Sequence, residues 1–507
     1  MSLQLNPDFE GTLSVVRAGD GRLQVSGKHC ARFGYVVDGD QGAWVRWDWQ
    51  DNTLIVENDR FGFTPLYYAA VPNGIHVATS IHELLALGID RSLDDEALSA
   101  FLRLGQYLGD DTPFKAIRAL APGTRLRWHD GRLSLEQRVS VLPTAGQTIS
   151  RDEAVRRYGE LMQAAVERMI PAPGTRMSVP LSAGRDSRHI LYALVRAGCK
   201  PDQIVTARAM APRPDTDAQV ASQIAAALGL PHTIIEQSAD RYRDERQKNL
   251  LTGYFADEHV QMMPVARWLR EHRIEVTWDG IAGDIFSCGV YDKPGFIESF
   301  QQPGMRTILD SELGDDGYLN TVLRPDAMAR WPREMAEQRL LRELERYRDL
   351  PNPIAPYFFL NRVRRKLALS PFGMLDRGTH VLAPYLDHDL FDTLIGLPFS
   401  YFTGRLFHSE AIDAFYPELP RFPYTSVHEG FIPERRDRIW NFVYQLARDA
   451  LDGGASQGRP SVTRRSLLAR LSKAVVSRDY GTRVPQLFGR LVVLMHLESE
   501  LTSEVRS

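Results

Sequence analysis

The sequence predicts an α/β protein in which a mostly β N-terminal region is followed by a parallel sheet and a largely helical C-terminal part. Up to about residue 140, short runs rich in Val, Tyr and Trp alternate with turn residues, as in antiparallel strands. Between residues 177 and 278, short apolar runs alternate with helical patterns, which is typical of a parallel sheet with crossover helices. From about residue 320 onward, apolar residues recur mainly at helical spacing.

Length and composition narrow the class of protein. A chain of 507 residues is long enough for about two to four domains. The net charge of −3 gives no electrostatic ground for binding nucleic acid or a membrane surface. The three cysteines are too few and too far apart for a disulfide framework or a zinc site, which fits a reducing cytoplasm. No signal peptide and no apolar run of membrane-spanning length is apparent, so we expect a cytoplasmic protein.

The N-terminal region, residues 1–140, is expected to form a domain of antiparallel strands with two helices. The expected strands cover residues 34–37, 43–47, 53–57, 63–69 and 74–78, the helices 81–87 and 94–104, and a closing hairpin 122–133. Residues 141–150 contain Pro, Gly and polar side chains and form a predicted linker. Ser150 and Glu153 have the spacing of a capping box, so a helix and the second domain, residues 151–507, begin there.

The second domain is predicted to hold strands at 177–181, 202–210, 231–235 and 274–278. In a parallel sheet, ligands bind beyond the carboxyl ends of the strands, where the loops 182–187 and 279–284 are expected. The helices expected after residue 320 cover 325–349, 354–369, 387–396, 407–416, 436–452, 463–476 and 484–503, and residues 452–460 are predicted to form a flexible loop.

The loop from Ser182 to Ser187 has the features of a phosphate site. A turn of small residues before a helix offers successive backbone N–H groups, which attract anions. Asp186 would repel a bare phosphate, so its presence indicates a bridging cation such as Mg²⁺. The loop is not a Walker A sequence, because it lacks the Gly-Lys-Ser/Thr ending. On the local pattern alone, an ordinary capped turn explains the residues equally well.

Four stretches, in the same order and with compatible spacing, resemble the asparagine synthetase superfamily. That family joins a glutaminase domain of the N-terminal-nucleophile type to an ATP-pyrophosphatase domain. Residues 58–68 resemble its D-R-F-G-x-x-P-L-Y-Y segment, and residues 181–187 resemble its S-G-G-x-D-S loop. Residues 280–289 resemble its G-x-G-x-D-E-x-F-x-G loop and keep Asp284, and residues 383–387 resemble its R-x-P-F-L-D segment. The resemblance is greatest to lasso-peptide cyclases and β-lactam synthetases.

The N-terminal domain departs from the family pattern. Family glutaminases carry a cysteine directly after the initiator Met, but position 2 here is Ser. The first half of the family's domain, with its N-G-E-I-Y-N segment, is absent. The resemblance therefore implies an α+β sandwich remnant of a glutaminase domain, inactive and kept for packing, in which residues 59–68 are core and interface elements. Ser2 as a substitute nucleophile is the alternative.

The resemblance also implies a set of site residues. Asp186 and Asp284 would share Mg²⁺. Arg405 matches a family lysine position, and Tyr424 fills the place of a second lysine, with His428 close by, so these three are the candidate catalytic residues. The residues expected to bind ATP are Leu181, Ser182, Ala183, Gly184, Asp186, Ser187, Ala209, Met210, Gly280 and Ile281.

Other cations could compensate for the missing lysine, and the candidates are Arg421, His428, Arg435 and Arg436. A family glutamate is also lost, because Ile281 stands in its place. The basic segment 361–366 is a candidate site for an acidic substrate or phosphates, although a basic helix face is more often simply solvated.

Two functions are compatible with these residues. The resemblance implies an ATP-dependent ligase that adenylates a carboxylate and joins it to an amine without glutamine hydrolysis. Its substrate would be a small molecule or peptide bearing both groups, as in lasso-peptide macrolactam formation, and a precursor peptide or a protease could be its partner. The alternative is a catalytically weakened scaffold or regulator that binds nucleotide or peptide, because the family lysine and glutamate are lost.

Overall fold

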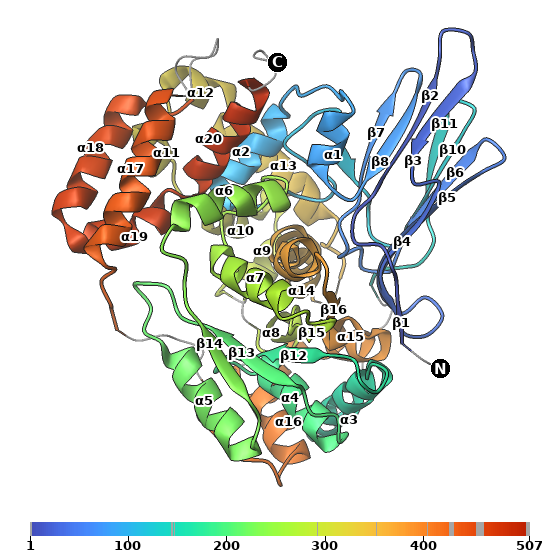
Figure 1. Cartoon of the computed structure of the whole chain (residues 1–507), viewed down its shortest axis with the longest axis vertical. Helices are drawn as coiled ribbons and strands as arrows, with labels where there is room; N and C mark the ends of the chain where they lie inside the picture. The colour runs from blue at the N-terminus through green and yellow to red at the C-terminus, as the bar shows by residue number, and fades with distance from the viewer. Residues whose placement is uncertain are drawn as a thin grey trace.

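Two antiparallel sheets face each other in the N-terminal part of the chain, as the computed structural model shows (Figure 1). The described residues are 3–142, 146, 148–289, 291, 293–350, 352–402, 404–424, 430–452 and 461–502. The strands are β1 (Gln4–Leu5), β2 (Thr12–Arg17), β3 (Leu23–Gly27), β4 (Cys30–Val36), β5 (Gly42–Gln50), β6 (Thr53–Asn58), β7 (Tyr67–Val71), β8 (Gly74–Ala78), β9 (Arg118–Ala119), β10 (Thr124–His129) and β11 (Arg132–Gln137). Their orders are β1-β4-β5-β6-β10-β11 and β3-β2-β8-β7-β9.

The predicted strands of this part are present, but three more precede them. β3 is exposed along much of its length, so it lacks the apolar alternation that marks a half-buried strand. β1 is only two residues long and is defined by its pairing with β4. Neither feature is visible in the local sequence.

A third sheet is parallel, as predicted for the second domain, and has the order β14-β13-β12-β15-β16. Its strands are β12 (Met177–Pro180), β13 (Gln203–Ala207), β14 (His232–Ile235), β15 (Val276–Trp278) and β16 (His380–Leu382). β16 was missed, because it is only three residues long and pairs with a strand distant in sequence. The loops that follow β12, β13 and β15 meet at one edge of this sheet, because parallel strands end on the same side.

Helices cover the parallel sheet and continue to the end of the described chain. None of the described helices is long and apolar enough to cross a membrane. The α-helices are α1 (Ile81–Ala86), α2 (Asp95–Leu104), α3 (Arg151–Arg168), α4 (Asp186–Arg196), α5 (Thr216–Leu228), α6 (Arg241–Leu251), α7 (Met263–Glu271), α8 (Gly283–Ser287), α9 (Phe296–Gln301), α10 (Arg306–Leu313), α11 (Gly317–Val322), α12 (Pro325–Arg330), α13 (Arg333–Glu345), α14 (Ile354–Phe358), α15 (His388–Ile395), α16 (Phe407–Phe415), α17 (Arg436–Asp452), α18 (Arg464–Val476), α19 (Arg478–Leu487) and α20 (Gly489–Thr502).

Two long helices expected from the sequence are broken, so those two predictions are wrong. The segment 325–349 forms α12 and α13, because Pro332 stands at the N-cap of α13 and has no N–H to continue a helix. The segment 484–503 forms the end of α19 and all of α20, with the break at Phe488. The predicted loop 452–460 lies, except for Asp452, outside the described residues, as does part of the predicted linker.

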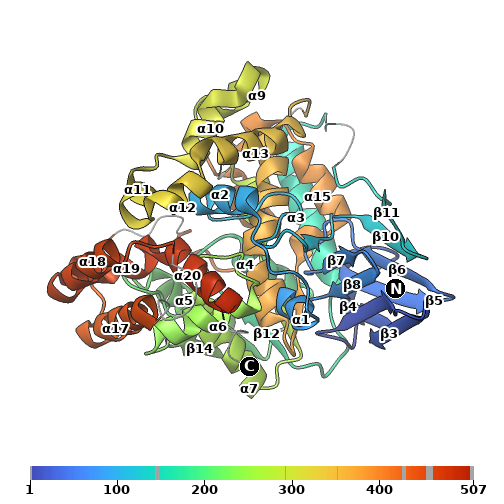
Figure 2. The same ribbon diagram turned by 90° about the horizontal axis from the view of Figure 1, so that it is seen from above.

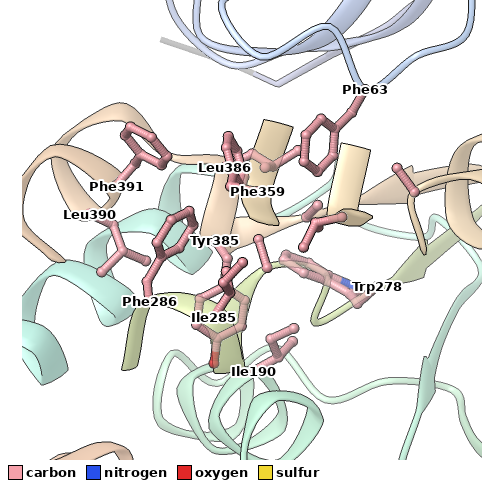
Figure 3. Packing of buried hydrophobic residues seen from close by; sticks show 14 of the residues in the cluster. Phe63, Ile190, Trp278, Ile285, Phe286, Phe359, Tyr385, Leu386, Leu390 and Phe391 are labelled. Atoms are coloured by element: carbon pink, nitrogen blue, oxygen red, sulfur yellow. The ribbon is translucent and has the colours of Figure 1, made fainter. Parts of the chain in front are cut away.

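The N-terminal part and the part that contains the parallel sheet share a hydrophobic core cluster. α2 packs against α13, far along the chain, and Figure 2 shows the two helices side by side. Phe63 reaches down to Phe359, with ring centroids 5.1 Å apart (Figure 3). Tyr35 and Phe61 belong to the same core cluster, so the N-terminal part is an integral support for the rest.

The basic segment 361–366 serves this interface. Buried Arg364 donates hydrogen bonds to the carbonyl oxygens of Gly62, Gly109 and Leu120, at 3.1, 3.2 and 2.6 Å. Lys366 is almost fully buried and pairs with Asp257. The expectation that this segment binds an acidic substrate is therefore wrong for Arg364 and Lys366. Their charged groups already bind oxygen atoms of the protein.

Replacing Arg364 tests how strongly the two parts are joined. Arg364→Met should lower the free energy of unfolding by about 3–5 kcal/mol, because three buried carbonyl groups lose their donor. Urea unfolding followed by circular dichroism measures the change. Arg342→Met removes an exposed ion pair with Glu96 between the same two parts and should leave the midpoint unchanged. Equal effects of the two variants on the free energy of unfolding would contradict the role of Arg364 in joining the two parts.

Candidate functional site

A cavity of about 1090 Å³ opens at the carboxyl ends of the parallel strands. Its floor is the loop after β12, the end of β13 and the loop after β15, and other walls come from α6, α10, α11, α19 and α20. This volume lies slightly above the range for small-molecule sites, roughly 300–1,000 Å³. Of the expected nucleotide-binding residues, those that line the cavity are Leu181, Ser182, Gly184, Asp186, Ser187, Ala209, Met210 and Gly280.

The loop after β12 is held by its own polar groups. Gly184 N donates to Ser182 Oγ at 3.1 Å, and Ser182 N donates to Ser187 Oγ at the same distance. Ala183 is fully buried behind the loop, and its N–H donates to Asp217 Oδ1 at 2.8 Å. Ala183 does not take a positive φ, so alanine is accommodated here without the freedom of glycine.

Asp186 lies directly against the backbone of the loop after β15. A Cβ atom on Gly280 would lie 2.6 Å from Asp186 Cβ, and one on Gly283 would lie 2.4 Å from Asp186 Oδ1. Only glycine permits this approach. Ile281 N donates to Asp279 Oδ1 at 2.8 Å, and the Ile281 side chain packs against the hydrophobic core rather than lining the cavity.

Three half-buried carboxyl groups, those of Asp186, Asp279 and Asp284, gather where the two loops meet. Burial raises the pKa of Asp186 well above its usual value, and the charges of Asp284 and Asp279 raise it further. Burial also raises the pKa of Asp284, against which the charges of Arg362 and Arg405 act. Asp279 has a pKa of about 6, again because of burial.

These carboxyl groups fit a divalent cation that is shared with a ligand. Asp186 Oδ1 is buried and makes no hydrogen bond. Among the described residues, no group of three His, Cys, Asp or Glu side chains could enclose a metal. Mg²⁺ typically binds one or two carboxylates and completes its shell with water and substrate phosphates, so Asp186 and Asp284 suit a phosphate-bound Mg²⁺.

A buried histidine beneath Asp186 was not predicted. His408 is fully buried, with its Nδ1 3.4 Å from Asp186 Oδ1 and 2.8 Å from Ser287 Oγ. Its Nε2 lies 3.0 Å from the Tyr158 hydroxyl and 3.1 Å from His189 Nδ1. Burial lowers the pKa of His408 well below its usual value, so the ring is neutral and positions Asp186 without cancelling its charge. No local motif in the sequence marks this residue.

The three candidate catalytic residues have different surroundings. Arg405 is exposed, has a φ of 59°, and its charge acts on Asp284. Tyr424 packs beside the loop after β12, and its hydroxyl donates to Asp413 Oδ1 at 2.9 Å. His428 lies outside the described residues. Neither Arg405 nor Tyr424 lines the cavity.

Comparison with known proteins finds similarity over two parts of the chain. Residues 36–138 match the glutamine amidotransferase domain. Putative glutamine-hydrolyzing asparagine synthetases of Mycobacterium bovis and Mycobacterium tuberculosis are each 27% identical over 274 residues, which is 51% of this chain and 41% of theirs. The chain is similar to these asparagine synthetases over about half of its length. The match thus spans less than half the length of these relatives, and the resemblance of the sequence to this superfamily is confirmed.

Two solved structures show weaker similarity. One is the allosteric regulatory enzyme of purine biosynthesis, with 38% of this chain and 32% of that chain covered. The other is the glutamine phosphoribosylpyrophosphate amidotransferase from B. subtilis complexed with ADP and GMP, with 48% and 44% covered. Both are 14% identical with a TM-score of 0.14, values too low to show a shared fold.

The contact between Asp186 and the loop after β15 can be tested by a substitution that adds a single methyl group. Gly283→Ala should displace the Asp186 carboxylate and weaken Mg²⁺-dependent ATP binding about tenfold or more, because overpacking costs roughly 1–3 kcal/mol. Isothermal titration calorimetry measures the affinity, and the circular dichroism spectrum should remain unchanged. Gly19→Ala, where an added methyl group meets nothing within 4 Å, is the control. Equal ATP affinities of the two variants would refute the role given to this contact.

Proposed function

We propose that this protein is an ATP-dependent ligase that adenylates a carboxylate and joins it to an amine, with release of AMP and pyrophosphate. The observation that carries the proposal is the meeting of Asp186, Asp284 and the Ser182–Ser187 loop at the edge of a cavity. The relationship to asparagine synthetases supports the ligase class.

The residues of the cavity can be assigned to the two half-reactions, adenylation of the carboxylate and attack by the amine. Gly184 and the hydroxyl groups of Ser182 and Ser187 bind the phosphates, while Ala209 and Met210, which follow β13, line the adenine side. Mg²⁺ on Asp186 and Asp284 would offset phosphate charge. A carboxylate oxygen attacks the α-phosphorus, and the bond to pyrophosphate breaks. The amine then attacks the acyl carbon and loses a proton, and AMP leaves.

We propose further that the amine does not come from glutamine. The one cysteine of the N-terminal part, Cys30, is exposed at the start of β4 and follows β1, β2 and β3 in the chain, so it is not placed as the N-terminal nucleophile that such a glutaminase uses. The cavity has room beside a nucleotide for a substrate that carries both carboxylate and amine, so ring closure, such as macrolactam formation in a lasso peptide, is compatible with it. A precursor peptide or protease partner and a cytoplasmic location belong to the same proposal.

A non-catalytic scaffold or regulator is the second candidate. It is favoured by Ile281, which packs where the family places a glutamate, and by Tyr424, whose hydroxyl is engaged with Asp413 where the family places a lysine. Such a protein would bind nucleotide or peptide without turnover.

The two carboxylates separate these candidates. The wild-type protein is expected to bind ATP with Mg²⁺ and to release pyrophosphate when offered candidate acids and amines. Asp186→Asn and Asp284→Asn should each lower that rate roughly a hundredfold or more, because they remove the metal ligands. Asp310→Asn, an exposed residue of α10, is the control. Biological activity that survives in both site variants would instead support the scaffold.

The nitrogen source is tested separately at Ser2. Wild-type protein incubated with glutamine is expected to release no glutamate, and Ser2→Ala should keep the full rate of ATP-dependent pyrophosphate release. Chromatographic detection of glutamate and a coupled pyrophosphate assay give the two measurements. Glutamate release that disappears in Ser2→Ala would show Ser2 to be a working nucleophile.

A further inference from the structure

The loop after β12 carries a guanidinium group that forms no ion pair with any described residue. Arg185 stands between Gly184 and Asp186, which both line the cavity, whereas its own side chain is not part of the lining and lies against Tyr424. Within the described ranges it has no side-chain hydrogen bond, and although the residue is half-buried, its Nε atom is fully buried without an acceptor. A guanidinium group with such an unpaired N–H donor is available to an anion.

The neighbouring arginine, Arg188 of α4, is held by carbonyl groups of the protein through its terminal nitrogens, although its Nε atom also lacks an acceptor. Arg188 is 1% exposed and donates to the carbonyl oxygens of Phe422, Pro423 and Ala183 at 2.6, 3.0 and 3.1 Å. These bonds tie the segment that precedes Tyr424 to α4. Arg188 is therefore a structural residue and is not available to a ligand.

Tyr424 lies between the two guanidinium groups. The Arg188 Cζ atom is 4.1 Å and the Arg185 Cζ atom 5.3 Å from the centre of its ring. The bond from its hydroxyl to Asp413 Oδ1 fixes the orientation of the ring. A cation–π contact holds an arginine in place without removing its charge, so Arg185 stays both oriented and unneutralised.

The other candidate cations are engaged or distant. Arg421 donates to the carbonyl oxygen of Asp413, and Arg435 pairs with Asp437. Arg405 is exposed, and its charge acts on Asp284. Arg185 is the cation that lies next to Asp186 in sequence, and its charge lowers the pKa that burial raises in that residue.

We propose that Arg185 binds the β- and γ-phosphates of ATP and the pyrophosphate that leaves, and that Tyr424 is its positioning residue. This inference rests on the proposed ligase function and assigns its missing cation to the loop after β12. A guanidinium group offers two parallel N–H donors to phosphate oxygens, and a fixed cation stabilises the charge that develops on the leaving group.

The test compares nucleotides that differ only in these phosphates. Calorimetric affinities are measured for ATP and AMP with Mg²⁺, and for pyrophosphate in competition with ATP. Arg185→Ala should lose about ten- to hundredfold in affinity for ATP and pyrophosphate but less than about twofold for AMP. Arg185→Lys should recover part of the loss. Arg196→Ala, which removes an arginine stacked on Phe415 at the other end of α4, is the matched control and should bind all three like wild type.

Tyr424 variants test the positioning role. Tyr424→Leu should lower the affinity for ATP severalfold and leave that for AMP unchanged, and Tyr424→Phe, which keeps the ring, should restore most of it. Equal losses for ATP and AMP, or an unchanged ratio of the two in Arg185→Ala, would overturn the assignment of Arg185. Wild-type protein that binds no ATP would overturn the proposed function itself, and the two failures are thus distinguishable.

Discussion

The repulsion among the half-buried carboxyl groups at the edge of the parallel sheet is the constraint on which the site depends. Asp186 and Asp284 are desolvated and close enough for the charge of Asp284 to raise the pKa of Asp186. Removing such charges from water is costly unless a cation compensates them. In the function proposed above, Mg²⁺ would supply this compensation, and a cation that binds only the folded state would also stabilise it. Folding and ligand binding would then be linked through the same two side chains.

The N-terminal part contributes to this arrangement from a distance. Tyr35 of β4 accepts a hydrogen bond from Ala383 N at 3.1 Å, and so fixes the segment that follows β16. Two residues on, the Tyr385 hydroxyl lies 3.4 Å from the carbonyl oxygen of Asp186 and 3.3 Å from His408 Nε2. The N-terminal part thus has a structural role that does not depend on glutaminase chemistry, because it helps to hold Asp186 in place.

The sequence was sufficient for features that are local. The strand, small-residue turn and helix around Ser182 follow from an apolar run, a turn and a helical pattern, and β12 and α4 form as predicted. It was insufficient where a role depends on distant partners. His408 lies in a helix with an ordinary apolar pattern, and β16 exists only through its pairing with β15. Arg364 looked like a solvated charge, although three carbonyl groups from the N-terminal part surround it.

The cation proposed to bind pyrophosphate also could not be predicted from the sequence. Tyr424 stands in the place of a family lysine, and this indicates weakened catalysis when only matching positions along the chain are compared. Electrostatic stabilisation depends instead on where a charge lies in space. Arg185 comes from another element, and Tyr424 is the surface on which it rests. A scaffold that binds only peptide would gain nothing from a guanidinium group that is oriented beside the phosphate loop without an ion pair, whereas a site for a nucleoside triphosphate needs positive charge there.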